Sequence, residues 1–86
     1  GKLAGEQKYI SQLIDASLKV QVVDEKKGVI VVTNISDIPF QTLFGERMIP
    51  VLFRPHSAIR ITVPKGTELD FVNCYVGRQT LKKEIW

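Results

Sequence analysis

The stretch that decides the fold is LKVQVVDEKKGVIVVTN, residues 18–34. From Leu18 to Val22, apolar and polar residues alternate, which is the pattern of a half-buried β-strand. A polar segment that ends in glycine, residues 24–28, then predicts a turn. The continuous β-branched run at residues 29–33 is typical of a strand that is buried on both faces, so the whole stretch predicts a β-hairpin.

The rest of the chain predicts further short strands separated by turns that contain proline or glycine. Pro50 breaks one of them and indicates an edge strand or an irregular crossing, because proline cannot donate a hydrogen bond to a sheet. In another, Ile59, Ile61 and Val63 alternate with polar or small residues and are expected to point inward. The predicted strands are residues 40–44, 48–53, 58–63, 69–76 and 81–85, and the predicted turns are residues 34–39, 45–47, 55–57, 64–67 and 77–79.

Regular turns between short alternating strands, with no helices between them, are typical of a sandwich or a barrel. We expect an immunoglobulin-like antiparallel β-sandwich of six or seven short strands, and a small closed barrel is the alternative. A chain of 86 residues, 44% of them hydrophobic, is long enough for one core and no more.

A leading amphipathic helix is predicted before the hairpin, over residues 5–17. A helix of about a dozen residues is marginal by itself, so its apolar stripe needs a partner surface, either the sheet of this domain or a neighbouring domain. We therefore divide the chain into a leading helix or interdomain joint, residues 2–17, and a β-sandwich domain, residues 18–86. The stripe, which is a candidate interdomain contact, consists of Tyr9, Ile10, Leu13 and Ile14.

Composition excludes several classes of function. The net charge of +3 and the pI near 9.2 come from scattered basic residues rather than a basic cluster, so we expect no nucleic-acid partner. No apolar run approaches the roughly 18 residues of a membrane-spanning helix, so we expect no membrane insertion. The single cysteine, Cys74, cannot form an internal disulfide and is expected to be a small buried apolar residue.

The residues that could carry catalysis do not form a recognisable set. His56 is the only histidine and lies in a predicted turn, where an exposed imidazole is expected, and no local motif supports its pairing with Cys74. Glu68 and Asp70 share a strand face and are interpreted as charges that protect an edge strand from aggregation. We therefore expect no catalytic residue, no metal site and no cofactor, and predict that the chain is not an enzyme.

Two further patterns concern glycans. Asn34-Ile35-Ser36 matches the acceptor motif for N-glycosylation, but we interpret these residues as shaping the turn. Tyr75 and Trp86 are the candidate aromatics for a polysaccharide partner, although four of the seven aromatic residues are phenylalanine, which prefers a core. Glycan binding is the alternative function.

Three segments resemble a known kind of domain: YISQLIDASL at residues 9–18, TNISDIPF at 33–40 and RPHS at 54–57. In this order, and over most of the chain, the sequence resembles the C-terminal immunoglobulin-like domain of bacterial exported hydrolases. It looks most like the domains that follow phosphoesterases of the polymerase-and-histidinol-phosphatase type. The metal-binding histidine clusters of those phosphoesterases are absent from this sequence, so no catalytic residue is carried over.

The resemblance implies a function and a location. It implies a non-catalytic accessory or interaction module of a larger exported bacterial hydrolase, which packs on the neighbouring catalytic domain and orients it. A periplasmic or extracellular location follows from the same resemblance.

Overall fold

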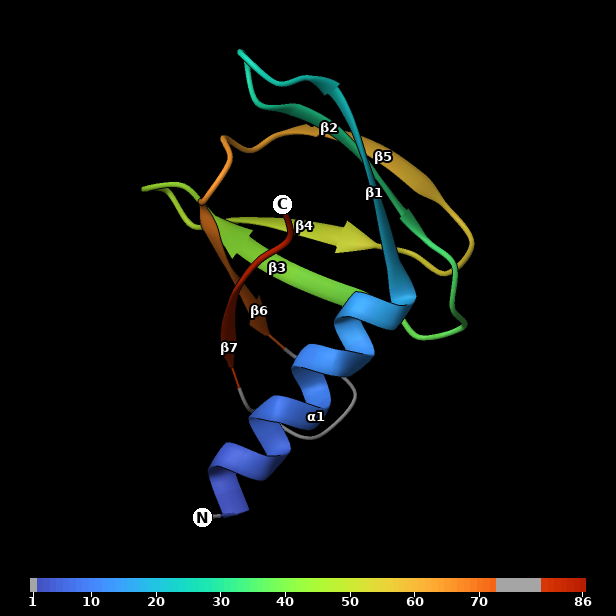
Figure 1. Cartoon of the computed structure of the whole chain (residues 1–86), viewed down its shortest axis with the longest axis vertical. Coiled ribbons are helices and arrows are strands. Elements are labelled where there is room, and N and C mark those ends of the chain that lie inside the picture. The colour runs from blue at the N-terminus through green and yellow to red at the C-terminus, as the bar shows by residue number, and fades with distance from the viewer. Residues whose placement is uncertain (1, 73–79) are drawn as a thin grey trace.

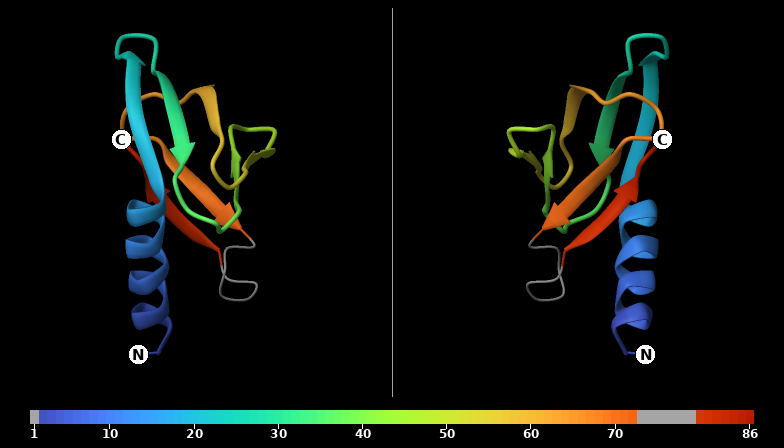
Figure 2. Two further views of the ribbon diagram at one scale, coloured as in Figure 1. Left: turned by 90° about the vertical axis from the view of Figure 1, so that its right-hand side faces the viewer. Right: turned by 90° about the vertical axis from the view of Figure 1, so that its left-hand side faces the viewer.

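The protein is a two-layer β-sandwich with one helix in front (Figures 1 and 2). The computed structural model describes residues 2–72 and 80–86, with side-chain environments from Lys8 onward. The elements are α1 (Lys2–Ser17), β1 (Leu18–Asp24), β2 (Val29–Asn34), β3 (Phe40–Phe44), β4 (Ile49–Phe53), β5 (Ala58–Thr62), β6 (Glu68–Val72) and β7 (Leu81–Glu84).

The strands form two antiparallel sheets. One sheet has the order β1-β2-β5 and the other the order β4-β3-β6-β7. The predicted immunoglobulin-like sandwich is therefore confirmed, and the alternative of a closed barrel is not. The fourth strand pairs with the third, whereas in antibody constant domains it joins the sheet of the first, second and fifth strands.

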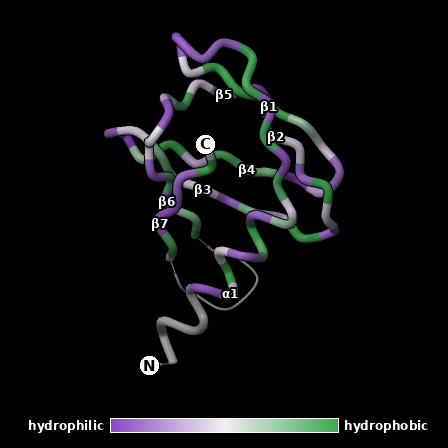
Figure 3. Tube along the Cα trace, in the orientation of Figure 1, coloured by the Kyte–Doolittle hydropathy of each residue, from purple (hydrophilic) through white to green (hydrophobic). Residues whose placement is uncertain are grey.

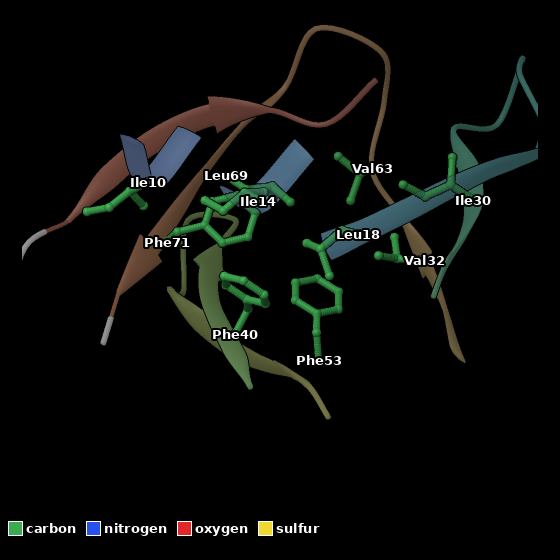
Figure 4. Packing of buried hydrophobic residues seen from close by; sticks show 10 residues of the cluster. All are labelled: Ile10, Ile14, Leu18, Ile30, Val32, Phe40, Phe53, Val63, Leu69 and Phe71. Atoms are coloured by element: carbon green, nitrogen blue, oxygen red, sulfur yellow. The ribbon is translucent and has the colours of Figure 1, made fainter. Parts of the chain in front are cut away.

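The core lies between the two sheets and is filled by side chains at alternate positions of the strands (Figure 4). The rings of Phe53 and Phe71 lie 6.3 Å apart at a tilt of 34°, a favourable geometry for two aromatic rings. Each large apolar side chain buried in this way contributes about 1.5–3 kcal/mol. The buried apolar residues are Ile10, Ile14, Leu18, Ile30, Val32, Phe40, Phe53, Val63, Leu69 and Phe71.

The helix packs on this domain's own core. Ile10 and Ile14 lie one turn apart on one face of α1, and both are 1% exposed. The helix contacts β1 and β7 and so covers the side of the sandwich between these two edge strands. Lys83 of β7 fixes it there, because its ammonium group donates to Ser11 Oγ at 2.8 Å and lies 3.0 Å from Asp15 Oδ1. The first turns of α1 extend beyond the ends of the strands (Figure 2).

Several local predictions are confirmed. The hairpin of β1 and β2, the turn that follows and the weakly alternating β3 lie where the sequence predicted them. Pro50 lies in β4, which is an edge strand with β3 as its partner. Ile59, Ile61 and Val63 all face the core.

Other predictions need correction. β2 is not buried on both faces, because Ile30 and Val32 are fully buried whereas Val29, Val31 and Thr33 are half-buried. The physical reason is that the fold has two layers, so no element of the described chain covers the outer face of this sheet. The helix begins at Lys2, three residues before the predicted start. The predicted turn at residues 77–79 lies outside the described residues.

Hydrophilic residues concentrate in the turns at the ends of the strands, most clearly in the β1–β2 hairpin (Figure 3).

Asn34, at the end of β2, is a polar residue that is fully buried, with 0% of its surface exposed. Its Nδ2 donates to the carbonyl oxygens of Ile38 at 2.7 Å and Phe53 at 3.0 Å. Its Oδ1 accepts hydrogen bonds from Ser36 N at 3.0 Å and Ser36 Oγ at 2.7 Å. A single carboxamide therefore joins β2, the turn after it and β4 of the opposite sheet.

Gly28 ends the β1–β2 turn at a point of close backbone approach. Its φ of 71° lies in the left-handed region, and its carbonyl oxygen accepts a 2.6 Å hydrogen bond from Val63 N. A Cβ atom at this position would lie 2.8 Å from Pro64 Cα. Gly45, in the β3–β4 turn, has a similar φ of 80°, but no atom lies within 4 Å of the place of its Cβ. A substitution at Gly45 would therefore introduce backbone strain alone, whereas the same substitution at Gly28 would add steric overlap.

We predict that Gly45→Ala lowers the free energy of unfolding by about 1 kcal/mol, the cost of a left-handed backbone. Gly28→Ala should lower it by roughly 1–3 kcal/mol more, because the new methyl group overlaps the backbone of Pro64. Urea unfolding of the two variants and the wild type measures the difference. Equal losses in the two variants would show that the close approach to Pro64 is wrong.

Candidate functional site

The apolar stripe of the helix is mostly inaccessible. Ile10 and Ile14 are buried in the core of this domain, and Leu13 is half-buried against it. Tyr9 is 52% exposed and is the one member of the stripe that is free to contact another surface.

The candidate sugar-binding aromatics do not form a platform among the described residues. The indole N–H of Trp86 donates to Val63 O at 2.6 Å, and the ring packs half-buried against the core. Phe40 and Phe53 are fully buried. Tyr75 lies outside the described residues, as does Cys74, so their predicted roles stay predictions.

His56 lies on an exposed turn, where sequence analysis predicted it. Its Nε2 is 2.5 Å from Asp37 Oδ1, but the two side chains are 63% and 94% exposed. The neighbouring hydroxyl of Ser57 donates to Arg54 O at 2.7 Å, so its proton is engaged by the backbone. The pair of His56 and Asp37 therefore links two surface turns, and it faces open solvent rather than a cleft.

The Asn34 motif shapes a turn, as we interpreted it. The atom that would carry a glycan, Asn34 Nδ2, donates both of its protons to backbone carbonyls in the interior. Ser36 completes the turn, because its hydroxyl accepts a hydrogen bond from Ile38 N at 3.1 Å. The folded domain thus offers no acceptor at this motif.

Within residues 2–72 and 80–86, no group of three histidine, cysteine or carboxylate side chains is placed to hold a metal ion. Over the same residues, no helix has both the length and the hydrophobicity needed to cross a bilayer.

A small hollow of about 200 Å³ separates α1 from the end of the chain. It is lined by Ile14, Asp15, Leu18, Val20 and Ile85.

The surface with the most unusual chemistry is the outer face of the four-stranded sheet, around Asp70. The register places Asp70 of β6 directly opposite Leu43 of β3 on one side and Lys82 of β7 on the other. Beside this row, Glu68 lies opposite Glu84. A hollow of about 270 Å³ opens here, which we call the Asp70 hollow. It is lined by Leu43, Phe44, Gly45, Met48, Glu68, Asp70 and Lys82.

The charges around the Asp70 hollow do not balance. Among the described residues, three carboxylates and one basic residue lie on this face, although the whole chain has a net charge of +3. The negative charges of Glu68 and Glu84 lie directly opposite each other on the neighbouring strands β6 and β7, which is an unfavourable arrangement. Asp70 Oδ1 is buried and has no hydrogen-bond partner among the described residues. A buried acceptor without a donor costs about 1–3 kcal/mol.

Exposed apolar side chains continue from the hollow along the edge strand. Met48 and Leu52 are 47% and 46% exposed, and Met48 also lines the hollow, whereas Ile49 lies opposite Phe44 and points to the other face of the sheet. We call Met48 and Leu52 the β4 strip. Apolar side chains grouped beside charged ones are typical of a surface that binds another macromolecule.

The predicted role of Glu68 and Asp70 as charges on an edge strand is wrong. Both residues belong to β6, which lies between β3 and β7 inside the sheet. Protection of an edge therefore does not explain these carboxylates. The sequence showed that they share a face, but it held no signal for which strands flank β6.

Comparison with family models, with curated proteins and with solved structures found no match to this chain.

We predict that Asp70→Asn raises the free energy of unfolding by about 0.5–1 kcal/mol, because it removes a charge whose buried oxygen has no donor. The change also relieves repulsion with the neighbouring carboxylates. Glu25→Gln, in the exposed β1–β2 turn, is the matched control and should change stability very little. Urea unfolding at low ionic strength measures both variants. A loss of stability in Asp70→Asn would show that the carboxylate supports the fold.

Proposed function

We propose that this domain is a non-catalytic interaction module, which binds another protein surface through the Asp70 hollow and the β4 strip. The observation that carries the proposal is the coincidence, on one face, of exposed apolar side chains with a buried carboxylate oxygen that lacks a partner. Both features are unfavourable in the isolated domain, and a bound protein surface would cover the apolar side chains and, with a cation, offset the charge of Asp70.

A non-catalytic role is supported by the use of the polar side chains inside the fold. Asn34 and Ser36 hold a turn, and Thr42 Oγ1 donates to Asp70 O at 3.1 Å across two strands. Ser57 is likewise engaged with the backbone. These hydroxyls and amides therefore stabilise the sandwich, and they are not gathered around a cavity.

The sequence resemblance suggests which protein the module serves. It implies the catalytic domain of a bacterial exported hydrolase, and we keep this partner as part of the proposal. The helix is compatible with it, because the first turns of α1 extend beyond the strands (Figure 2) and the side chain of Tyr9 is exposed. Glycan binding is not proposed, because the indole N–H of Trp86 is already bonded to Val63.

Met48 offers a direct test, because it is the only methionine of the chain and belongs to the β4 strip. We predict that hydroxyl radicals oxidise Met48 several-fold more slowly in the natively purified natural protein, with its bound partners, than in the isolated 86-residue chain. A thioether is among the most readily oxidised side chains, and covering it slows the reaction. Mass spectrometry of the peptide that contains Met48 measures the rate.

The matched control is the double variant Met48→Leu, Val23→Met. Val23 is 46% exposed on the other sheet, so the new thioether starts with nearly the same exposure as Met48. Its oxidation should be equally fast in the two forms of the protein. Equal oxidation of Met48 itself in both forms would refute the proposed function.

A further inference from the structure

We infer that the Asp70 hollow receives an arginine side chain that is flanked by apolar residues of the protein partner. This inference rests on the proposed function and names the chemistry that the surface recognises. It is carried by charge complementarity, because the described residues of this face include Glu68, Asp70 and Glu84 but only one lysine, in a chain whose net charge is +3.

The lysine of this face does not neutralise the carboxylates. Lys82 lies directly opposite Asp70 in the register, yet no ion pair joins it to Asp70 or Glu68 in the described part of the chain. Asp70 lines the hollow with its negative charge, and its buried Oδ1 has no donor among the described residues. The hollow therefore has room and charge for a second cation from outside.

The walls of the hollow favour a guanidinium group over an ammonium group. Glu68 and Asp70 lie two residues apart on one face of β6, so a planar group with several N–H donors could bond to both carboxylates. Leu43 and Met48 form apolar walls, against which the weakly hydrated faces of a guanidinium pack better than a strongly hydrated ammonium.

The partner is expected to bind through side chains rather than by adding a strand to the sheet. β4 is the exposed edge beside the hollow, but Pro50 in its middle has no N–H to donate. Backbone pairing along this edge would therefore be interrupted. The apolar residues on either side of the arginine would instead lie on Met48 and Leu52, which are each about half exposed.

The test uses the capped tripeptide Leu-Arg-Leu and its neutral isostere Leu-citrulline-Leu, titrated into the ¹⁵N-labelled 86-residue chain at low salt. We expect saturable amide shifts at residues 43–48, 68–70 and 82 with the arginine peptide, and affinity at least about fivefold weaker with the citrulline peptide. Leu-Lys-Leu should also bind more weakly than Leu-Arg-Leu. Raising the salt should weaken the arginine peptide most, since its extra affinity is electrostatic.

Three variants make the test specific. Asp70→Asn should weaken Leu-Arg-Leu about fivefold and leave Leu-citrulline-Leu unchanged, because only the charged interaction is lost. Lys82→Gln should strengthen Leu-Arg-Leu, because it removes the competing cation of this face. Glu25→Gln, far from the hollow, should leave both affinities unchanged. The same spectra report whether each variant is folded.

The inference is overturned if the arginine and citrulline peptides bind equally, if Asp70→Asn has no effect on the difference, or if the shifts lie on the other sheet. Equal binding of Leu-Lys-Leu would overturn the preference for a guanidinium. These failures are distinct from failure of the proposed function, which is decided by the protection of Met48 in the natural protein.

Discussion

The carboxamide of Asn34 is the interaction on which the rest of the structure depends. Its two N–H groups and its oxygen make four hydrogen bonds in the interior, and they join β2, the turn after it and the end of β4. The backbone of Asn34 adds two more, because its N–H donates to Ser57 O and its carbonyl accepts from His56 N. Asn34 thus anchors the β2–β3 turn and the β4–β5 turn, which both pass from one sheet to the other at this end of the sandwich. A buried amide is tolerable there only because every one of its groups is satisfied.

This arrangement also bears on the proposed interaction surface. The turns that contain the potentially reactive side chains, including His56 and Ser57, are tied to Asn34 and serve the fold. The helix covers the side between β1 and β7, so that part of the core is closed as well. Among the described residues, the outer face of the four-stranded sheet retains both exposed apolar side chains and a carboxylate oxygen with no partner. That face is unfavourable for an isolated domain and suited to an interface.

The parts of this structure that local patterns decide could be predicted from the sequence. The alternation from Leu18 to Val22, the glycine turn after it and the spacing of Ile10 and Ile14 are all signals within a few residues, and each predicted the right type of element, although the helix begins three residues earlier than predicted. The class of fold followed from the number and spacing of such elements. What could not be predicted depends on contacts distant in sequence. The half-burial of Val31 arises because the described part of the chain forms two layers, and the position of Asp70 within the sheet results from the pairing of β6 with β3 and β7. No residue near Asp70 carries that information.

The most direct measurement is hydrogen exchange at the side-chain amide of Asn34, followed by NMR after transfer of the protein into D₂O. The structure predicts that both Nδ2 protons persist long after the exposed carboxamide of Gln21 has exchanged, because they are buried and bonded to Ile38 O and Phe53 O. Exchange of the Asn34 amide as fast as that of Gln21 would mean that the two sheets are not joined in this way, and the assignment of the remaining surfaces would no longer hold.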